Sequence, residues 1–269
     1  ATAVARASAR RTWLVSILVQ VLIPVVALLL WQAAVGGIVA GFHPLDPVLV
    51  GRPDRVAAEL VRLIRSGQLP EHLSATFTEA ILGLALAIVT GVTAGIAAAS
   101  NRALAGVTLP YVNIANAIPK LALGPLFLIW FGIGLSSKVA VSAAAAFFPL
   151  FYTTYQGVRG TDRELLHAMR IMGAGRWALL RLVTLPSVLT WLVAGLRTSL
   201  GLAIVGAVVG EYLGSTKGLG YLLLAAQGML NTDRAWAILV ILGAIGVALD
   251  GLARFLEHWL LRWRTAEGP

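Results

Sequence analysis

Long apolar runs, separated by short polar segments, dominate this chain of 269 residues. A membrane-spanning helix needs about 20 predominantly apolar residues, and several runs approach or exceed that length. Six spans are predicted, at residues 13–35, 77–99, 107–131, 138–155, 188–209 and 235–256. The pattern therefore predicts an all-α fold class, a polytopic membrane protein with six transmembrane helices in one transmembrane domain over residues 1–269.

The third apolar run contains three prolines, Pro110, Pro119 and Pro125. Proline removes a backbone donor, and in a membrane the carbonyl that it frees must be satisfied by a neighbouring helix or a cavity. This run is therefore predicted to be a broken helix, or a bent lead-in followed by a span that ends near Phe131.

The polar segments divide the rest of the domain. Residues 41–74 form an outer amphipathic segment, with a helix predicted over 53–64 from the spacing of Val56, Leu60 and Leu63. The core of the domain is placed at residues 75–257 and a basic tail at 258–269. Glu79, near the outer end of the second span, is expected to face water. Glycine pairs four residues apart predict close helix packing, against a neighbouring helix or a second protomer; they are Gly91 with Gly95 and Gly206 with Gly210.

A basic, amphipathic stretch, Asp162–Pro186, lies within the loop at residues 157–186. Helical spacing puts Leu165, Met169 and Met172 on one side, with the arginines largely elsewhere. Gly173 is expected to end the first helix, and a second short helix is expected to run from Arg176 toward Pro186. The pattern suits docking to a cytoplasmic partner, but it equally suits an interfacial helix pair whose arginines meet lipid phosphates.

Composition and charge agree with a membrane protein. The chain is 58% hydrophobic and 12% charged, with a mean hydropathy of +0.85, whereas soluble domains carry roughly 25% charged residues. Because cysteine is absent, neither disulfides nor a thiolate metal site are expected. The net charge of +9 is spread between apolar runs rather than gathered in one patch, so no nucleic-acid partner is expected.

Charge also predicts the topology. With six spans, the N-terminal side holds twelve basic and four acidic residues, and the other side holds seven basic and six acidic ones. The positive-inside rule then places both termini and the loop at 157–186 in the cytoplasm. The first apolar run is longer than the hydrophobic region of a signal peptide, so it is interpreted as a retained span.

Nothing in the sequence indicates catalysis. The chain contains no G-x-x-x-x-G-K-[ST] phosphate loop, its four histidines are scattered, and no base is placed beside a nucleophile. We therefore expect this chain not to be an enzyme, and to bind no metal or other cofactor itself.

Ionisable groups at membrane depth are candidates for a solute pathway, because burial there is costly. Lys120 and Arg197 come first, followed by Glu211 and by the aromatic ring of Trp130. A pathway with a positive field would suit an anion. The alternatives are that Lys120 reaches to the interface, that Arg197 pairs with an acid or caps helix carbonyls, and that Trp130 is an interfacial anchor.

The basic loop resembles the EAA loop of ABC-importer permeases, in which Glu-Ala-Ala is followed by a glycine and later by Ile-x-Leu-Pro. This chain has HAM at 167–169, a glycine at 173 and VTLP at 183–186. It departs at His167, where the family has glutamate, and Glu164 lies one turn earlier. The residues that the resemblance assigns to coupling with an ATPase are Glu164, His167, Ala168, Gly173, Leu185 and Pro186.

Three longer stretches are similar to the nitrate, taurine and alkanesulfonate importer permeases: AIPKLALGPLFLIWFGIGLSSK at 117–138, GLRTSLG at 195–201 and EYLGSTKGLGYLL at 211–223. The resemblance implies a permease subunit in the bacterial inner membrane, within the lipid bilayer, that moves a small anionic or sulfonated solute inward. It implies as partners a second copy of the chain, two ATPase subunits that bind ATP and Mg, and a periplasmic or lipid-anchored solute-binding protein. A pyrimidine vitamin precursor or an aromatic acid is the alternative solute.

Two other classes of membrane protein are alternatives. A stand-alone secondary transporter or channel would be favoured by an inverted repeat or by paired acids at mid-membrane, and neither is apparent in the sequence. A scaffold that anchors a partner through the basic loop would need neither the proline-broken third run nor polar groups at depth.

Overall fold

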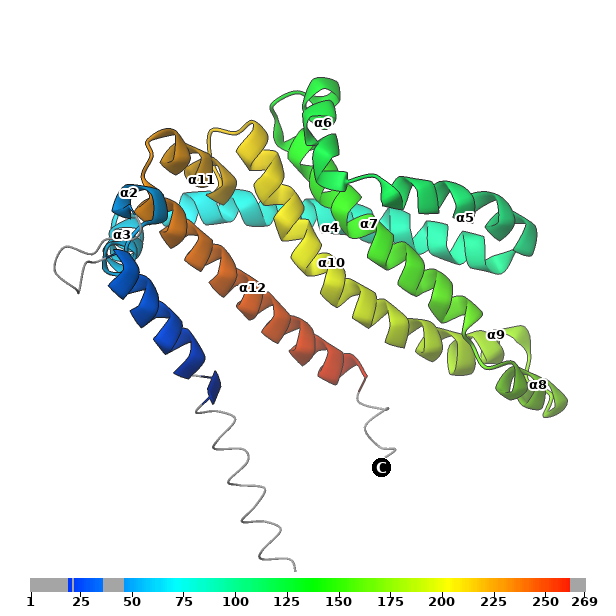
Figure 1. Cartoon of the computed structure of the whole chain (residues 1–269). Coiled ribbons are helices and arrows are strands. Elements are labelled where there is room, and N and C mark those ends of the chain that lie inside the picture. Colours follow the sequence, from blue (N-terminus) through cyan, green and yellow to red (C-terminus); the bar gives the residue numbers. More distant parts are fainter. Residues whose placement is uncertain (1–18, 21, 36–45, 262–269) are drawn as a thin grey trace, which may run out of the picture. The chain divides into compact units, whose positions relative to one another are not determined.

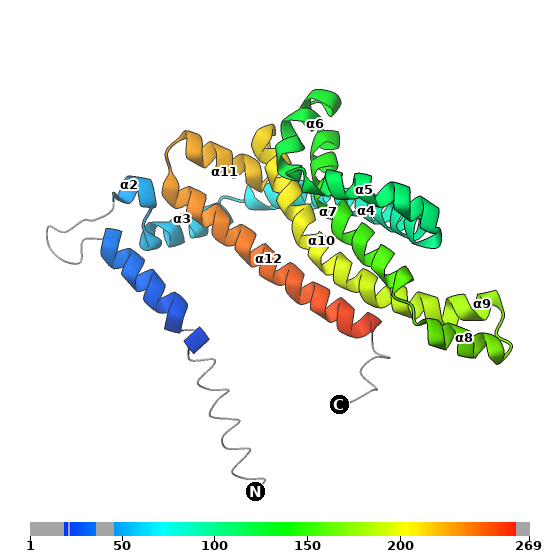
Figure 2. The same ribbon diagram turned by 45° about the vertical axis from the view of Figure 1, so that its right-hand side comes forward.

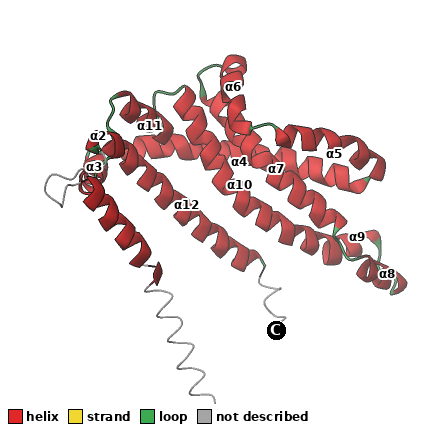
Figure 3. Cartoon of the chain, viewed as in Figure 1, coloured by secondary structure: helices red, strands yellow, loops and turns green. Residues whose placement is uncertain are grey.

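The computed structural model describes residues 19–20, 22–35 and 46–261. Within these ranges the chain forms helices joined by short turns and contains no strand (Figure 3). The all-α prediction is confirmed. The chain divides into two compact units, residues 1–67 with 225–240, and residues 68–224 with 241–269, and each is described by itself.

The larger unit contains most of the long helices (Figure 1). Its elements are α4 (Leu69–Ser100), α5 (Arg102–Ala117), η1 (Lys120–Leu123), α6 (Gly124–Phe131), α7 (Leu135–Arg159), α8 (Arg163–Ile171), α9 (Arg176–Leu179), η2 (Leu180–Thr184) and α10 (Leu185–Leu213). Parts of α11 (Leu219–Gly228) and α12 (Thr232–Leu260) also belong to it.

Helix α7 is the centre of this unit and packs against both α4 and α10. The buried cluster between the three helices consists mainly of alanines, namely Ala80, Ala87, Ala146, Ala203 and Ala207, together with Leu150. Small side chains let the backbones approach, which maximises van der Waals contact where lipid supplies no hydrophobic driving force between helices.

The glycines of α4 and α10 lie directly against α7. A Cβ atom on Gly95 would sit 2.8 Å from the carbonyl oxygen of Phe151, and one on Gly206 would sit 2.6 Å from the Cα of Ser142. Gly91 and Gly210 meet the α7 backbone at 3.0 Å in the same way. The predicted small-residue faces are confirmed, and both of them face α7.

Two buried serines join α7 to α10 in opposite directions. Ser142 Oγ donates to the carbonyl oxygen of Ala203 at 3.0 Å, and Ser199 Oγ donates to that of Ala146 at 3.0 Å. Both serines are fully buried. Interhelical hydrogen bonds of this kind contribute about 1 kcal/mol each, and their direction fixes how the two helices are rotated toward each other.

Among the described residues, four helices are long and apolar enough to cross a membrane: Leu69–Ser100, Leu135–Arg159, Trp177–Leu213 and Thr232–Leu260. The third predicted run is broken as expected, because α5 and the η1–α6 segment meet at 83°. Pro110 lies inside α5, and the break is at Ile118 and Pro119. The first predicted span lies partly outside the described residues, which show an apolar helix at Leu22–Val35. The total of six spans stays a prediction.

Several helices extend beyond the predicted segments. Helix α4 begins at Leu69, within the segment assigned to the polar loop. Helix α9 does not end before a separate span: it runs through the π-helical η2 into α10. Pro186 is tolerated because it lies in the first turn of α10, where the missing N–H has no required partner. The stretch between the predicted spans at 188–209 and 235–256 contains the end of α10 and all of α11.

The smaller unit contains α2 (Pro47–Val50), α3 (Pro53–Arg65), the helix Leu22–Val35 and the start of α12. The predicted helix at 53–64 is confirmed, with proline in its first turn. The turn before it is held by side chains: Asp233 Oδ1 accepts from the Arg52 amide at 2.7 Å, and Trp236 Nε1 donates to the Val50 carbonyl at 2.9 Å.

Replacing Gly206 with alanine should destabilise the chain, because the new methyl group would force α7 and α10 apart. Overpacking of this kind costs about 1–3 kcal/mol, so we expect a lower thermal unfolding midpoint in detergent. Gly201→Ala is the matched control, because a Cβ on this glycine of the same helix meets nothing within 4 Å. Equal midpoints for the two variants would contradict the close packing of α7 and α10.

Candidate functional site

The basic loop folds as two short helices beyond the C-terminal end of α7 (Figure 2). Asp162 caps α8, with its Oδ1 accepting from the amides of Glu164 at 2.8 Å and Leu165 at 3.3 Å. Gly173 makes the turn with φ of +85°, a left-handed conformation that glycine adopts at little cost. The predicted helix–glycine–helix arrangement is confirmed.

The apolar residues of this loop are not used in the packing of the chain itself. Ile171 is 87% exposed, Met172 81% and Trp177 78%. Leu165 and Leu182 are also exposed. An exposed apolar patch beside basic side chains is typical of a surface that binds a partner.

The residues assigned to coupling lie along this surface. Glu164, His167 and Ala168 are exposed on α8, and Gly173 is exposed at the turn. Leu185 is exposed and Pro186 is half-buried in the first turn of α10. Leu179 and Val183, which were not assigned to coupling, are buried, and their spacing of four residues places them on one side of a helix.

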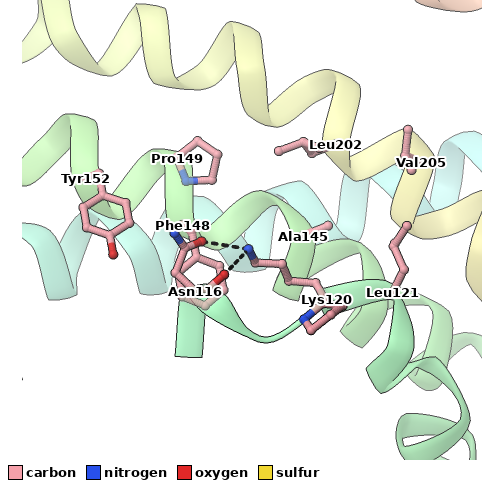
Figure 4. Close-up of a pocket in the computed structure, with 10 residues that line it drawn as sticks. Asn116, Lys120, Leu121, Ala145, Phe148, Pro149, Tyr152, Leu202 and Val205 are labelled. Atoms are coloured by element: carbon pink, nitrogen blue, oxygen red, sulfur yellow. Dashed lines mark hydrogen bonds between the residues drawn. The ribbon is translucent and has the colours of Figure 1, made fainter. Parts of the chain in front are cut away.

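A pocket of about 490 Å³ lies where the broken segment meets α7 and α10 (Figure 4). Its lining is mainly apolar and aromatic; it consists of Asn116, Pro119, Lys120, Leu121, Ala145, Phe148, Pro149, Tyr152, Leu202 and Val205. The break at Ile118 and Pro119 matters here, because it places the first residue of η1, Lys120, on the pocket wall.

The ammonium group of Lys120 is held in place within this pocket. Its Nζ donates to the backbone oxygen of Asn116 at 2.6 Å and to the side-chain Oδ1 at 2.8 Å, as the dashed lines in Figure 4 show. The ring of Phe148 lies 4.9 Å from Nζ, a distance at which the π-face attracts a cation. A lysine ammonium has three N–H donors, so one remains for a ligand. Of the lining residues, only Lys120 was predicted from the sequence as a candidate for the solute pathway.

Trp130 and Arg197 lie elsewhere. Trp130 is an exposed residue of α6, packed edge-to-face on Phe127, and does not line this pocket. Arg197 Nε donates to Asp250 Oδ1 at 2.8 Å, and its NH1 lies 3.7 Å from Glu257. Arg254 pairs with the same aspartate. The alternative that Arg197 pairs with an acid is therefore confirmed.

Two of the acidic side chains that the structure describes are buried, and the prediction for one of them, Glu79, was wrong. Glu79, expected to face water, is only 4% exposed and pairs with Lys138 at 3.6 Å. Glu211, a candidate for the solute pathway, is fully buried in α10 and lines neither described pocket. No paired acids were apparent along the chain, yet α4 and α10 bring Glu79 and Glu211 together beside α7.

Residues 87–262 match the family described as "Binding-protein-dependent transport system inner membrane component". The chain belongs to this family. The aliphatic sulfonates transport permease protein SsuC of Bacillus subtilis is 32% identical over 91% of this chain and 87% of its own length. The riboflavin permease RibX of Chloroflexus aurantiacus is 37% identical over 91% and 90%, and the taurine permease TauC of Escherichia coli is 30% identical over 84% of each chain.

Solved structures agree with this fold. A chain of the MetNI methionine ABC transporter, in an inward-facing conformation, has a TM-score of 0.58 at 23% identity and covers 70% of this chain and 92% of its own. A chain of an amino acid ABC transporter has a TM-score of 0.59 at 17% identity, with 76% and 97% covered. This inner membrane component is thus the permease component of an ABC importer, and its family places it in the inner membrane.

The ion pair between Arg197 and Asp250 of the permease can be tested by exchanging charges. Arg197→Asp should lower the thermal midpoint, because it gathers like charges between α10 and α12. Adding Asp250→Arg should recover part of the loss, with a coupling energy of about 1 kcal/mol, since the groups are partly exposed. A double variant no more stable than Arg197→Asp would show that the pair does not join these helices.

Proposed function

We propose that this permease moves a small anionic or sulfonated organic solute, of the aliphatic sulfonate or taurine class, into the cytoplasm. The observation that carries the proposal is the Lys120 ammonium, held on the wall of a largely apolar pocket of about 490 Å³. Two relatives named above, SsuC and TauC, carry sulfonates and taurine in their names.

The chemistry of the pocket suits a solute with one fixed negative charge and a short apolar body. The ammonium supplies a charge-assisted hydrogen bond, which is stronger than a neutral one. Phe148, Pro149 and Leu202 offer apolar surface for the rest of the solute. The names of the relatives RibX and ThiX contain riboflavin and formylaminopyrimidine. These two compounds carry no fixed negative charge, so Lys120 would contribute less to binding them. The lysine therefore favours the anionic class.

Transport is driven by ATP hydrolysis on a separate subunit, which docks on the α8–α9 surface. Two observations support this assignment: the sequence has no phosphate loop, and the apolar residues Ile171, Met172 and Trp177 are exposed beside arginines. Coupling residues are those assigned above, with Gly173 at the turn. ATP and Mg are bound by the ATPase subunits rather than by this chain.

The complete importer contains two copies of this permease, two ATPase subunits and a periplasmic or lipid-anchored solute-binding protein. The family description, which names a binding-protein-dependent system, supports the last of these. The excess of basic residues on one side of the spans supports cytoplasmic termini. Exposed apolar side chains on α5 and α6, including Ile114 and Ile129, suit contact with lipid or with the second copy.

Replacing Lys120 with methionine should lower uptake of an aliphatic sulfonate by about tenfold or more, because a hydrogen bond to a charged group is lost. Uptake would be measured at limiting solute in proteoliposomes containing the assembled importer. Lys217→Met removes an exposed cation and should leave uptake unchanged. Equal uptake by both variants would reject Lys120 as a solute-binding residue.

Replacing Gly173 with valine should uncouple ATP hydrolysis from uptake. A branched residue at φ of +85° is strained, so the turn would reset and displace α8 relative to α9. We expect ATPase activity to persist while uptake falls severalfold. Gly175→Val is the matched control, because this neighbouring glycine lacks a left-handed φ and a Cβ there meets nothing within 4 Å. Normal coupling in Gly173→Val would overturn this role for the turn.

A further inference from the structure

Helix α11 takes its N-terminal caps from other helices. The amide of Gly218 donates to His72 Nδ1 at 3.0 Å, and that of Leu219 donates to Thr76 Oγ1 at 3.0 Å, both on α4. The amide of Gly220 donates to Glu211 Oε2, on α10, at 2.7 Å. The first amides of a helix have no partner within the helix, so these three side chains determine where α11 begins.

The fit at this junction is tight. A Cβ on Gly220 would collide with the carbonyl oxygen of Val208, and a Cβ on Gly218 would collide with the carboxyl group of Glu211. Thr76 also donates to Glu211 Oε1 at 2.6 Å. Glu211 therefore joins α4, α10 and α11 at one buried point.

A second carboxyl and one ammonium lie behind Glu211. Glu79 Oε1 is 3.6 Å from Lys138 Nζ, and both residues are buried. Glu79 lies one helical turn from Thr76, which donates to Glu211, so the two carboxyl groups are neighbours. The other oxygen of Glu79, Oε2, is buried without a hydrogen-bond partner in the described part of the chain. The cluster thus contains two carboxyl groups, one ammonium and one unpaired acceptor.

Full ionisation would leave this cluster with one uncompensated negative charge. Burying a net charge is costly, and neighbouring carboxylates that share a site do not both ionise readily. We propose that the Glu79–Lys138–Glu211 cluster is a proton-binding site, that Glu79 holds the proton, and that the protonated state latches α11 to α4 and α10.

The position of the proton follows from the partners of each carboxyl group. Glu211 accepts two hydrogen bonds and lies at the N-terminus of α11, where the helix dipole favours a carboxylate. Lys138 balances that charge. A proton on Glu79 Oε2 converts the unpaired acceptor into a donor. His72, also at this junction, accepts an N–H at Nδ1 and stacks on Tyr221, so the neutral form of its imidazole is in place.

Loss of this proton should loosen the latch. The new charge on Glu79 would repel Glu211, which holds the Gly220 amide, so the start of α11 and the preceding loop at 214–218 would be held less firmly. This device lies apart from the Lys120 pocket and does not depend on which solute is carried.

Infrared spectroscopy of the full-length permease in lipid nanodiscs tests the site directly. The wild type at neutral pH should show the C=O band of a buried protonated carboxyl group. Glu79→Gln should abolish the band, and Glu71→Gln, which changes an exposed acid on the same helix, should retain it. Absence of the band from the wild type, or its persistence in Glu79→Gln, would overturn the proposal.

Glu211→Gln separates the shared proton from simple burial of Glu79. If charge balance holds the proton, this variant leaves Glu79 and Lys138 as a neutral pair and the band disappears. If the band stays, Glu79 is protonated without regard to Glu211 and the cluster proposal fails.

The pH profile of thermal stability provides an independent test of the latch. A free glutamate is ionised at neutral pH, so only the folded permease holds this proton and its stability should fall as the pH rises. At pH values where the folded permease holds this proton and the unfolded chain does not, the unfolding equilibrium should shift by up to about tenfold per pH unit. Glu79→Gln imitates the protonated form and should have the flatter profile, whereas Glu71→Gln should follow the wild type. Parallel profiles for Glu79→Gln and the wild type would contradict the latch.

Discussion

The close approach of α7 to both α4 and α10 is the constraint on which the rest of the larger unit depends. Lipid tails are as apolar as leucine, so helices in a bilayer associate through contact and hydrogen bonds rather than through hydrophobic burial. Gly95 and Gly206 provide the contact, and Ser142 and Ser199 provide the hydrogen bonds. A larger residue at Gly206 would separate α7 from α10 and weaken the contact and the hydrogen bonds together, and one at Gly95 would separate α7 from α4.

The same packing explains where the polar groups lie. Because α7 is flanked on two sides, Lys138 on α7 meets Glu79 on α4 and lies against Gly210, next to Glu211 on α10. In the loop beyond α7, by contrast, no such enclosure exists, and Ile171 and Met172 remain exposed. Buried charges inside the helix packing and exposed apolar residues outside it are the two features that point to function: the first to a proton site, the second to a docking surface.

The proline-broken segment between α5 and α6 links the architecture to the proposed solute pocket. In a continuous helix, the residues from Lys120 onward would follow the axis of α5. The break at Ile118 and Pro119 instead turns the chain by 83°, and Lys120 lies on the pocket wall beside Asn116 and Phe148. Irregular backbone at membrane depth is tolerated where it lines a cavity or is buried in protein. The pocket of about 490 Å³ fits that rule.

The sequence by itself determined the all-α class, the broken third run, the two-helix loop with Gly173 at its turn, and the glycine faces, because each depends on local periodicity or on the conformation of one residue. Its motifs also indicated the family. Only the tertiary structure decided that Arg197 pairs with Asp250, that Lys120 rests on Asn116, and that Glu79 is buried. Burial and pairing depend on residues far apart along the chain: Glu79 and Glu211 belong to different predicted spans, and nothing in either span shows that α7 brings them together.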